Sequence, residues 1–148
     1  MQASINCGPG LARASSSARQ NASALAIYRA ELAELARLGC RYVQLDEVPC
    51  AVLCDPVVRD AVRARGADPD ALVDRYARVL NDILAAKPAG MTIGIHFCRG
   101  NYKGQWMAAG GYEPIAERML GAVKADALFL EFDSTRAGGF TPLAAISP

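Results

Sequence analysis

Three short β-rich runs alternate with helical patterns along this chain, and each run ends in polar residues. The runs are CRYVQLDE at 40–47, MTIGIHFC at 91–98 and DALFLEFD at 126–133. Helical segments lie between them, so consecutive strands need crossover connections and should pair in parallel. The sequence therefore predicts an α/β fold built from parallel strands with crossover helices.

The helical segments carry recognisable start signals. Apolar residues recur at helical spacing from Ser23 onward, which predicts a first helix. Asp55 and Asp68 are each followed by proline, and an N-cap residue followed by proline at the first helical position is typical of a helix start. The segment YEPIAERMLGAVKA predicts a fourth helix after a glycine-rich loop.

The first 22 residues differ from the rest in composition. They are rich in serine, alanine and glycine, contain no acidic residue and show no sustained period. We expect a disordered or non-native segment over residues 1–22, followed by one domain over residues 23–148. An organelle transit peptide is the alternative interpretation of this acid-free segment.

Charge and hydropathy exclude several classes of partner. Sixteen basic and fifteen acidic residues leave a net charge of +1, which offers no electrostatic surface for nucleic acid or an anionic membrane. No apolar run reaches the roughly 20 residues that cross a bilayer. Five cysteines, an odd number, favour reduced thiols or a metal over a disulfide framework. We expect a cytoplasmic protein with small-molecule partners.

The ends of the second and third runs suggest a metal site. Chemistry in parallel α/β folds gathers at the carboxyl ends of the strands. Residues two apart on a strand face the same side, so His96 and Cys98 can direct an imidazole and a thiolate at one point. Glu131 can add a carboxylate from the next strand, and three such ligands are typical of catalytic zinc. A core histidine beside a buried cysteine is the alternative.

The first run ends in two carboxylates that should face opposite sides of the sheet. Asp46 is in phase with Tyr42 and Gln44, so we expect Asp46 to enter a site, as an acid-base group or by binding a cationic substrate group. Glu47 is expected to be structural. The pair Cys50 and Cys54 is expected to pack in the core.

Two cations follow the second run. Arg99 and Lys103 lie in the glycine-spaced loop after MTIGIHFC. They are either ligands for an anion or solvated loop charges.

Four motifs together resemble a known family. GCRYVQLDE, IHFCRGN, GGYEPIAE and LFLEFDSTRAGGFTPL are similar, in order and spacing, to the C-terminal catalytic barrel of cobalamin-independent methionine synthase. The likeness is greatest to the short single-barrel proteins related to that enzyme, and it covers about residues 24–146. It implies part of a (β/α)8 TIM-type barrel, with about three to four of its β/α units in this chain.

The resemblance also implies an activity. The family is a zinc-dependent methyltransferase that moves a methyl group from 5-methyltetrahydrofolate, in its polyglutamate form, to the thiolate of homocysteine, and so makes methionine. His96 and Cys98 look like its His-x-Cys zinc ligands, Glu131 looks like its glutamate ligand, and Asp46 resembles the aspartate that holds the substrate amino group. Zinc lowers the pKa of a bound thiol, which produces the nucleophile at neutral pH.

The family pattern extends past the residues of this sequence. Its fourth zinc ligand, a cysteine, and its proton-donating histidine would both fall downstream of Pro148, and further strands would fall upstream. We therefore expect self-association or a complementing chain to cover open sheet edges. Two alternatives stay open: a non-catalytic remnant or module with weak zinc binding, and a related zinc-dependent thiol alkyltransferase with a different acceptor.

Overall fold

A three-stranded parallel sheet organises the fold. The computed structural model of the chain describes residues 12–146. Its strands pair in the order β1-β2-β3, and the pairing of β1 with β2 runs from Tyr42 opposite Thr92 to Glu47 opposite Phe97. The strands are β1 (Tyr42–Glu47), β2 (Thr92–Phe97) and β3 (Ala127–Leu130). This confirms the predicted α/β fold with a parallel sheet.

Three α-helices accompany the sheet: α1 (Ala12–Arg37), α2 (Pro56–Ala64) and α3 (Pro69–Leu84). Both predicted N-caps are confirmed. Asp55 accepts a hydrogen bond from the backbone N–H of Val57 at 2.8 Å, and Asp68 accepts one from that of Asp70 at 2.9 Å. Each carboxylate satisfies an N–H that has no partner inside its helix.

Helix α1 begins earlier than the sequence pattern suggests. Residues 12–22, which the composition predicts to be disordered, form the first turns of α1. Residues 1–11 lie outside the described residues, and so do residues 147 and 148. The division of the chain at residue 23 therefore stays a prediction.

The segment predicted as a fourth α-helix forms a 3-10 turn followed by a π-helical segment. Residues Glu113–Ile115 form a 3-10 turn and Ala116–Leu120 form a π-helical segment, in place of one α-helix over YEPIAERMLGAVKA. The Gly121 N–H bonds to the carbonyl of Ala116, and a Cβ on Gly121 would lie 2.7 Å from the carbonyl oxygen of Ala145. The close approach of the C-terminal segment therefore ends this coil at a glycine.

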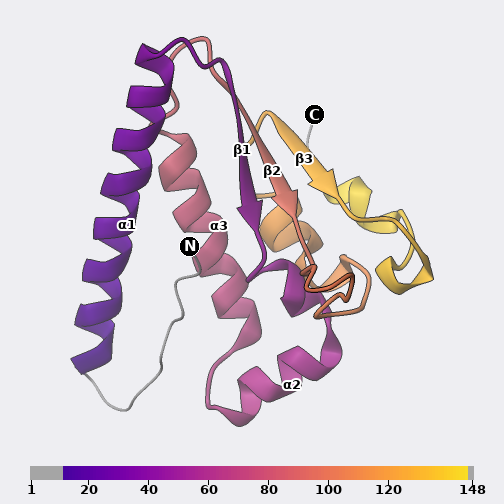
Figure 1. Cartoon of the computed structure of the whole chain (residues 1–148). Coiled ribbons are helices and arrows are strands. Elements are labelled where there is room, and N and C mark those ends of the chain that lie inside the picture. The colour runs from indigo at the N-terminus through magenta and orange to yellow at the C-terminus, as the bar shows by residue number, and fades with distance from the viewer. Residues whose placement is uncertain (1–11, 147–148) are drawn as a thin grey trace.

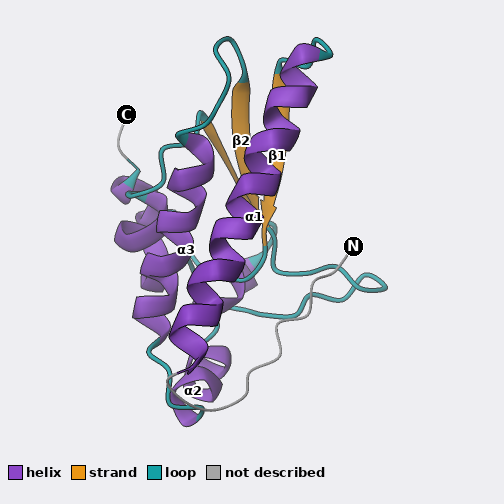
Figure 2. Cartoon of the chain, turned by 90° about the vertical axis from the view of Figure 1, so that its left-hand side faces the viewer, coloured by secondary structure: helices purple, strands orange, loops and turns teal. Residues whose placement is uncertain are grey.

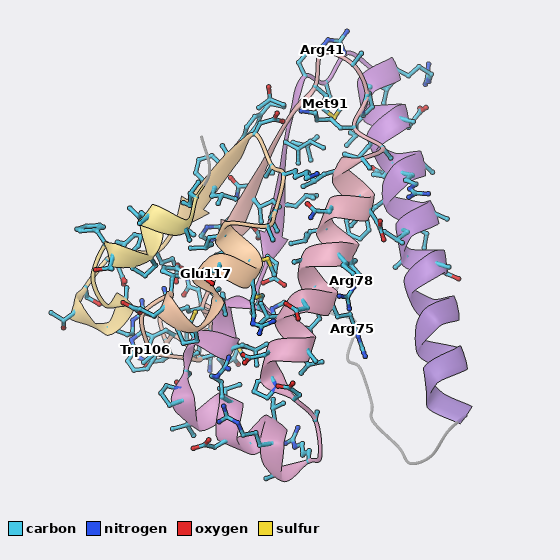
Figure 3. All side chains as sticks on the ribbon, turned by 180° about the vertical axis from the view of Figure 1, so that it is seen from behind. Arg41, Arg75, Arg78, Met91, Trp106 and Glu117 are labelled. Carbon is cyan, nitrogen blue, oxygen red and sulfur yellow. The ribbon has the colours of Figure 1, made fainter. Side chains whose placement is uncertain are left out.

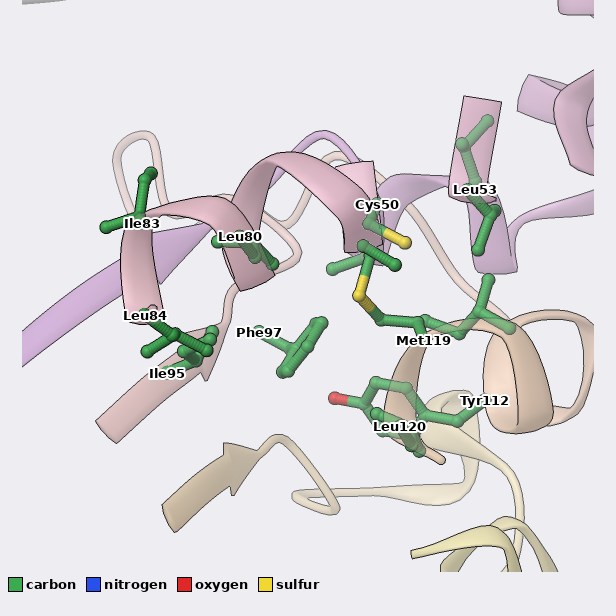
Figure 4. Close-up of a cluster of buried hydrophobic side chains, with 14 of the residues drawn as sticks. Cys50, Leu53, Leu80, Ile83, Leu84, Ile95, Phe97, Tyr112, Met119 and Leu120 are labelled. Carbon is green, nitrogen blue, oxygen red and sulfur yellow. The ribbon is translucent and has the colours of Figure 1, made fainter. Parts of the chain in front are cut away.

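Helices cover one face of the sheet. In Figure 1 α3 lies between α1 and the strands, and Figure 3 shows the same arrangement from behind. Figure 2 is seen from the helix side, and α1 crosses in front of β1 there. Ile93, Ile95 and Phe97 of β2 point toward this side and are fully buried. Figure 4 shows Phe97 among Leu80, Met119 and other apolar side chains. Burial of these side chains is the main stabilising contribution to the fold.

The opposite face of the sheet is open. Tyr42 and Phe129 lie on it and are 50% and 41% exposed. Gly94 lies between them in the register, and a Cβ there would lie 2.5 Å from the Phe129 ring and 3.2 Å from the Tyr42 hydroxyl. The two aromatic rings therefore fill the space above Gly94 instead of a second layer of helices.

The expected packing role of the cysteine pair is confirmed. Cys50 and Cys54 are both buried, and Figure 4 shows Cys50 beside Met119 in the core. Burial raises the pKa of both thiols, for Cys54 to about 12. In the part of the chain that the structure describes, no helix is both long enough and apolar enough to cross a membrane.

Glu47 faces the helices, opposite to Asp46, as the alternation along β1 predicts. Its buried carboxylate accepts hydrogen bonds from the backbone N–H groups of Cys50 at 2.7 Å and Ala51 at 3.3 Å. Burial raises the pKa of Glu47 from 4.5 to about 7, and the two hydrogen bonds oppose that rise. Glu47 therefore stabilises the turn after β1 through two hydrogen bonds, but burial of its ionised carboxylate is unfavourable.

This raised pKa predicts a pH-dependent stability. A carboxyl whose pKa is higher in the folded state stabilises the fold fully below its unfolded pKa and loses that contribution as the pH rises through the folded value. For Glu47 this loss runs from 4.5 to about 7. At 1.36 kcal/mol per pKa unit it amounts to roughly 3 kcal/mol. Urea unfolding at several pH values should show Glu47→Gln losing this part of the pH dependence.

The matched control is Glu117→Gln, an exposed residue of the π-helical segment Ala116–Leu120. It should keep the pH dependence of the unmodified chain. Parallel stability curves for Glu47→Gln and the unmodified chain between pH 4 and pH 8 would contradict the assignment.

Candidate metal centre

The three predicted ligands meet at the carboxyl edge of the sheet. His96 lies in β2, Cys98 is the first residue after β2, and Glu131 is the first residue after β3. The ligand atoms of these three residues all lie within 4.8 Å of one another, and each side chain is half-buried. The structure thus brings together every residue that the sequence suggests as a metal ligand.

The donor set fits a zinc ion. Tetrahedral zinc with bonds of about 2.0 to 2.3 Å holds its ligand atoms about 3.5 Å apart, so the three side chains would need to close by at most about 1 Å. One nitrogen, one sulfur and one oxygen match the donors that zinc accepts. Three protein ligands leave one tetrahedral position for another ligand.

The Cys98 sulfur has a hydrogen-bond donor behind it. The backbone N–H of Gly100 points at Cys98 Sγ, with a nitrogen to sulfur distance of 3.3 Å. Gly100 has a φ of +85°, and a Cβ there would lie 2.6 Å from the side chain of Met107. The positive φ favours glycine at this turn, and the N–H directed at the Cys98 sulfur orients that side chain.

The loop that follows β2 is fastened beside the three ligands. The N–H of Ala109 bonds to the Asp55 carboxylate at 2.8 Å, and the N–H of Gly110 bonds to the carbonyl of Arg136 at 2.9 Å. The N–H of Met107 bonds back to the carbonyl of Arg99 at 2.8 Å. These bonds fix the loop against the helix N-cap at Asp55 and against the turn after β3.

Arg99 is a residue whose place the sequence does not reveal. It is 0% exposed, whereas a loop arginine is usually solvated. Its backbone N–H bonds to Glu131 Oε2 at 3.1 Å, and its guanidinium lies 4.0 Å from the same oxygen. The one available signal is its position directly after Cys98.

Tyr112 is the second residue that sequence reasoning misses. Its ring lies against the Arg99 guanidinium, 4.1 Å from the ring centroid. Its hydroxyl accepts hydrogen bonds from Arg99 Nη1 at 3.0 Å and from the backbone N–H of Glu131 at 2.9 Å. Tyr112 thus connects the loop after β2 to the end of β3.

Asp46 lies beside the three ligands but outside their group. It is opposite His96 in the register of β1 and β2, so both side chains point to the open face. Asp46 is exposed and accepts a long hydrogen bond of 3.4 Å from Gln44 Nε2. Its role in binding substrate stays a prediction. Lys103 is exposed in the loop, near the Tyr102 ring.

Relatives of this chain are longer than the chain itself. No protein-family model matches it. The uncharacterised proteins YxjH and YxjG of Bacillus subtilis are 44% and 42% identical to it over 105 residues, which is 71% of this chain and 28% of each relative. The chain therefore spans little more than a quarter of the length of these curated relatives.

A solved structure resembles the chain in fold and sequence. It is the crystal structure of a Listeria monocytogenes protein that is provisionally assigned as a vitamin-B12 independent methionine synthase. The TM-score is 0.59 and the sequence identity is 29%, over 78% of this chain and 31% of that protein. The chain is thus similar to part of a protein with a methionine-synthase assignment.

Proposed function

We propose that this chain carries part of the zinc site of a methyltransferase of the cobalamin-independent methionine synthase type. The observation that supports the proposal best is the meeting of His96, Cys98 and Glu131 within 4.8 Å at the carboxyl edge of a parallel sheet. The similarity to the Listeria protein supports the methionine-synthase type of activity.

In this proposal the sheet belongs to a (β/α)8 barrel. Helices cover one face, as they cover the outside of such a barrel, and the face that carries Tyr42, Gly94 and Phe129 would point toward the barrel axis. The chain spans 28% of its Bacillus relatives, so the other strands would come from residues outside this sequence. The metal site would lie at the carboxyl end of the barrel, where catalytic groups gather.

The chemistry follows from the donor set. When bound, zinc would lower the pKa of a substrate thiol, so that a thiolate is present at neutral pH. His96, Cys98 and Glu131 would hold the ion, and Asp46 would bind the ammonium group of homocysteine. The sulfur forms a bond to the methyl carbon of 5-methyltetrahydrofolate while the bond from nitrogen to that carbon breaks. The nitrogen takes up a proton, which leaves methionine and tetrahydrofolate.

The first prediction concerns metal content. The purified chain should bind one zinc ion per molecule, and His96→Ala, Cys98→Ser and Glu131→Gln should each lower the zinc affinity by at least about 10-fold, since each removes one of three ligands. Competition with a chromophoric chelator measures this affinity.

Two matched variants serve as controls for the zinc measurement. Cys40→Ser changes a cysteine outside the group, and Asp133→Asn changes a carboxylate two residues after Glu131 that pairs with Arg136 instead. Both should bind zinc as the unmodified chain does. A chain that binds no zinc, or whose affinity drops equally in the controls, would overturn the proposal.

The second prediction concerns the reactivity of the thiols. Cys40 and Cys98 are half-buried and should react with iodoacetamide, whereas the buried Cys50 and Cys54, with raised pKa values, should react far more slowly. One equivalent of zinc should protect Cys98 and leave Cys40 reactive. Mass spectrometry of peptides reports each site. Equal protection of Cys40 and Cys98 would mean that the metal binds elsewhere.

The third prediction concerns Asp46. Cys98 should already give the cobalt-loaded chain a sulfur-to-cobalt charge-transfer band. Homocysteine should increase that absorption, and 4-mercaptobutyrate, which lacks the amino group, should do so only at higher concentration. Asp46→Asn should weaken homocysteine binding by about 10-fold, the worth of one charge-assisted hydrogen bond, and leave 4-mercaptobutyrate unchanged. Equal affinity of the unmodified chain for both thiols would favour an acceptor other than homocysteine.

A further inference from the structure

We propose that Arg99 and Tyr112 are positioning residues that hold Glu131 as a one-oxygen ligand, with Oε2 occupied and Oε1 directed at the metal. The inference rests on the proposed zinc site. It assigns a task to a buried arginine that neither the sequence pattern nor the comparisons explain.

Arg99 is fully buried, and its guanidinium donates its hydrogen bonds to uncharged oxygens. Its guanidinium donates to three oxygens: Tyr112 Oη at 3.0 Å, the Gly110 carbonyl at 2.8 Å and the Glu131 carbonyl at 3.1 Å. Its Nε has no hydrogen-bond partner among residues 12–146. The Glu131 carboxylate provides its ion pair, at the long distance of 4.0 Å. A fully buried cation needs an anion nearby, so Arg99 and Glu131 constrain each other's position.

The contacts of Glu131 are divided unequally between its two oxygens. Oε2 accepts the Arg99 backbone N–H at 3.1 Å and lies nearest the guanidinium. Oε1 accepts no hydrogen bond from a described residue. One oxygen is thus held in place by the protein, and the other is left for a metal shared with His96 and Cys98. This is the arrangement of a ligating carboxylate oriented by an outer hydrogen-bond partner.

Tyr112 holds both partners of this contact. Its fully buried hydroxyl accepts from the Arg99 guanidinium and from the backbone N–H of Glu131, so a single oxygen fixes the arginine and the backbone of the ligand. Because the Tyr112 ring is packed in the core, its hydroxyl has a fixed position and restricts the movement of Arg99 and Glu131. Removal of the hydroxyl should loosen Glu131 without removing any ligand atom.

The test measures zinc affinity and cobalt absorption in four purified chains. Tyr112→Phe removes only the hydroxyl, and Arg99→Lys keeps the charge but loses the forked hydrogen bonds. Both should fold and should lower zinc affinity about 10- to 100-fold, the usual effect of losing an outer partner of a metal ligand. Their cobalt complexes should show shifted d–d bands, because the carboxylate can then bind through both oxygens.

The matched control is Arg59→Lys. Among the described residues Arg59 is also a buried arginine, and it pairs with Asp70 on α3 instead of with a proposed ligand. This variant should lose thermal stability as Arg99→Lys does, but should keep the zinc affinity of the unmodified chain within about 2-fold. A loss of affinity that follows lost stability in all variants would reduce Arg99 and Tyr112 to structural residues.

A double-mutant comparison makes the inference specific. If Tyr112 acts through Glu131, then Tyr112→Phe should weaken zinc binding in the unmodified chain but cause no further loss in a Glu131→Ala chain. Additive losses would overturn the inference while leaving the zinc site intact. Absence of zinc binding by the unmodified chain would overturn the proposed function itself. Should Arg99→Lys fail to fold, unchanged affinity in Tyr112→Phe alone would still contradict the proposal.

Discussion

The alternation of side chains along β2 is the constraint on which the rest of the structure depends. Ile93, Ile95 and Phe97 are buried against the helices, so the residues between them must face the other side. That side receives His96 and, directly after the strand, Cys98. A shift of one residue in the register would place the imidazole in the core and an isoleucine at the edge, and both changes are costly. Core packing thus also places the candidate metal ligands on the open side of the sheet.

A second constraint is the buried charge of Arg99. The fold fastens the loop after β2 with backbone hydrogen bonds, with the Asp55 carboxylate and with a guanidinium that lies on the Tyr112 ring. Glu131 is the carboxylate that faces this cation. The same contacts that stabilise the loop therefore restrict the orientation of a proposed ligand. Stability and the proposed function are coupled at this edge of the sheet.

Local sequence signals predict a large part of this arrangement. Asp55 and Asp68 mark helix starts through short-range hydrogen bonds, and the period of two in IHFC sets which side chains share a face. Nothing local distinguishes a buried arginine from a solvated one, because the partners of Arg99 lie 11 to 32 residues away in the chain. The π-helical segment Ala116–Leu120 also ends beside a distant part of the chain, where Gly121 lies close to the backbone of Ala145.

The proposed zinc site contains one sulfur, from Cys98, together with His96 and Glu131. X-ray absorption of the chain loaded with one equivalent of zinc measures this directly. The proposed site should show one sulfur at about 2.3 Å from the zinc and nitrogen or oxygen neighbours at about 2.0 Å. Two or more sulfurs would indicate binding at other cysteines such as Cys50 and Cys54, and an absence of sulfur would exclude Cys98. Either result would contradict the proposed site.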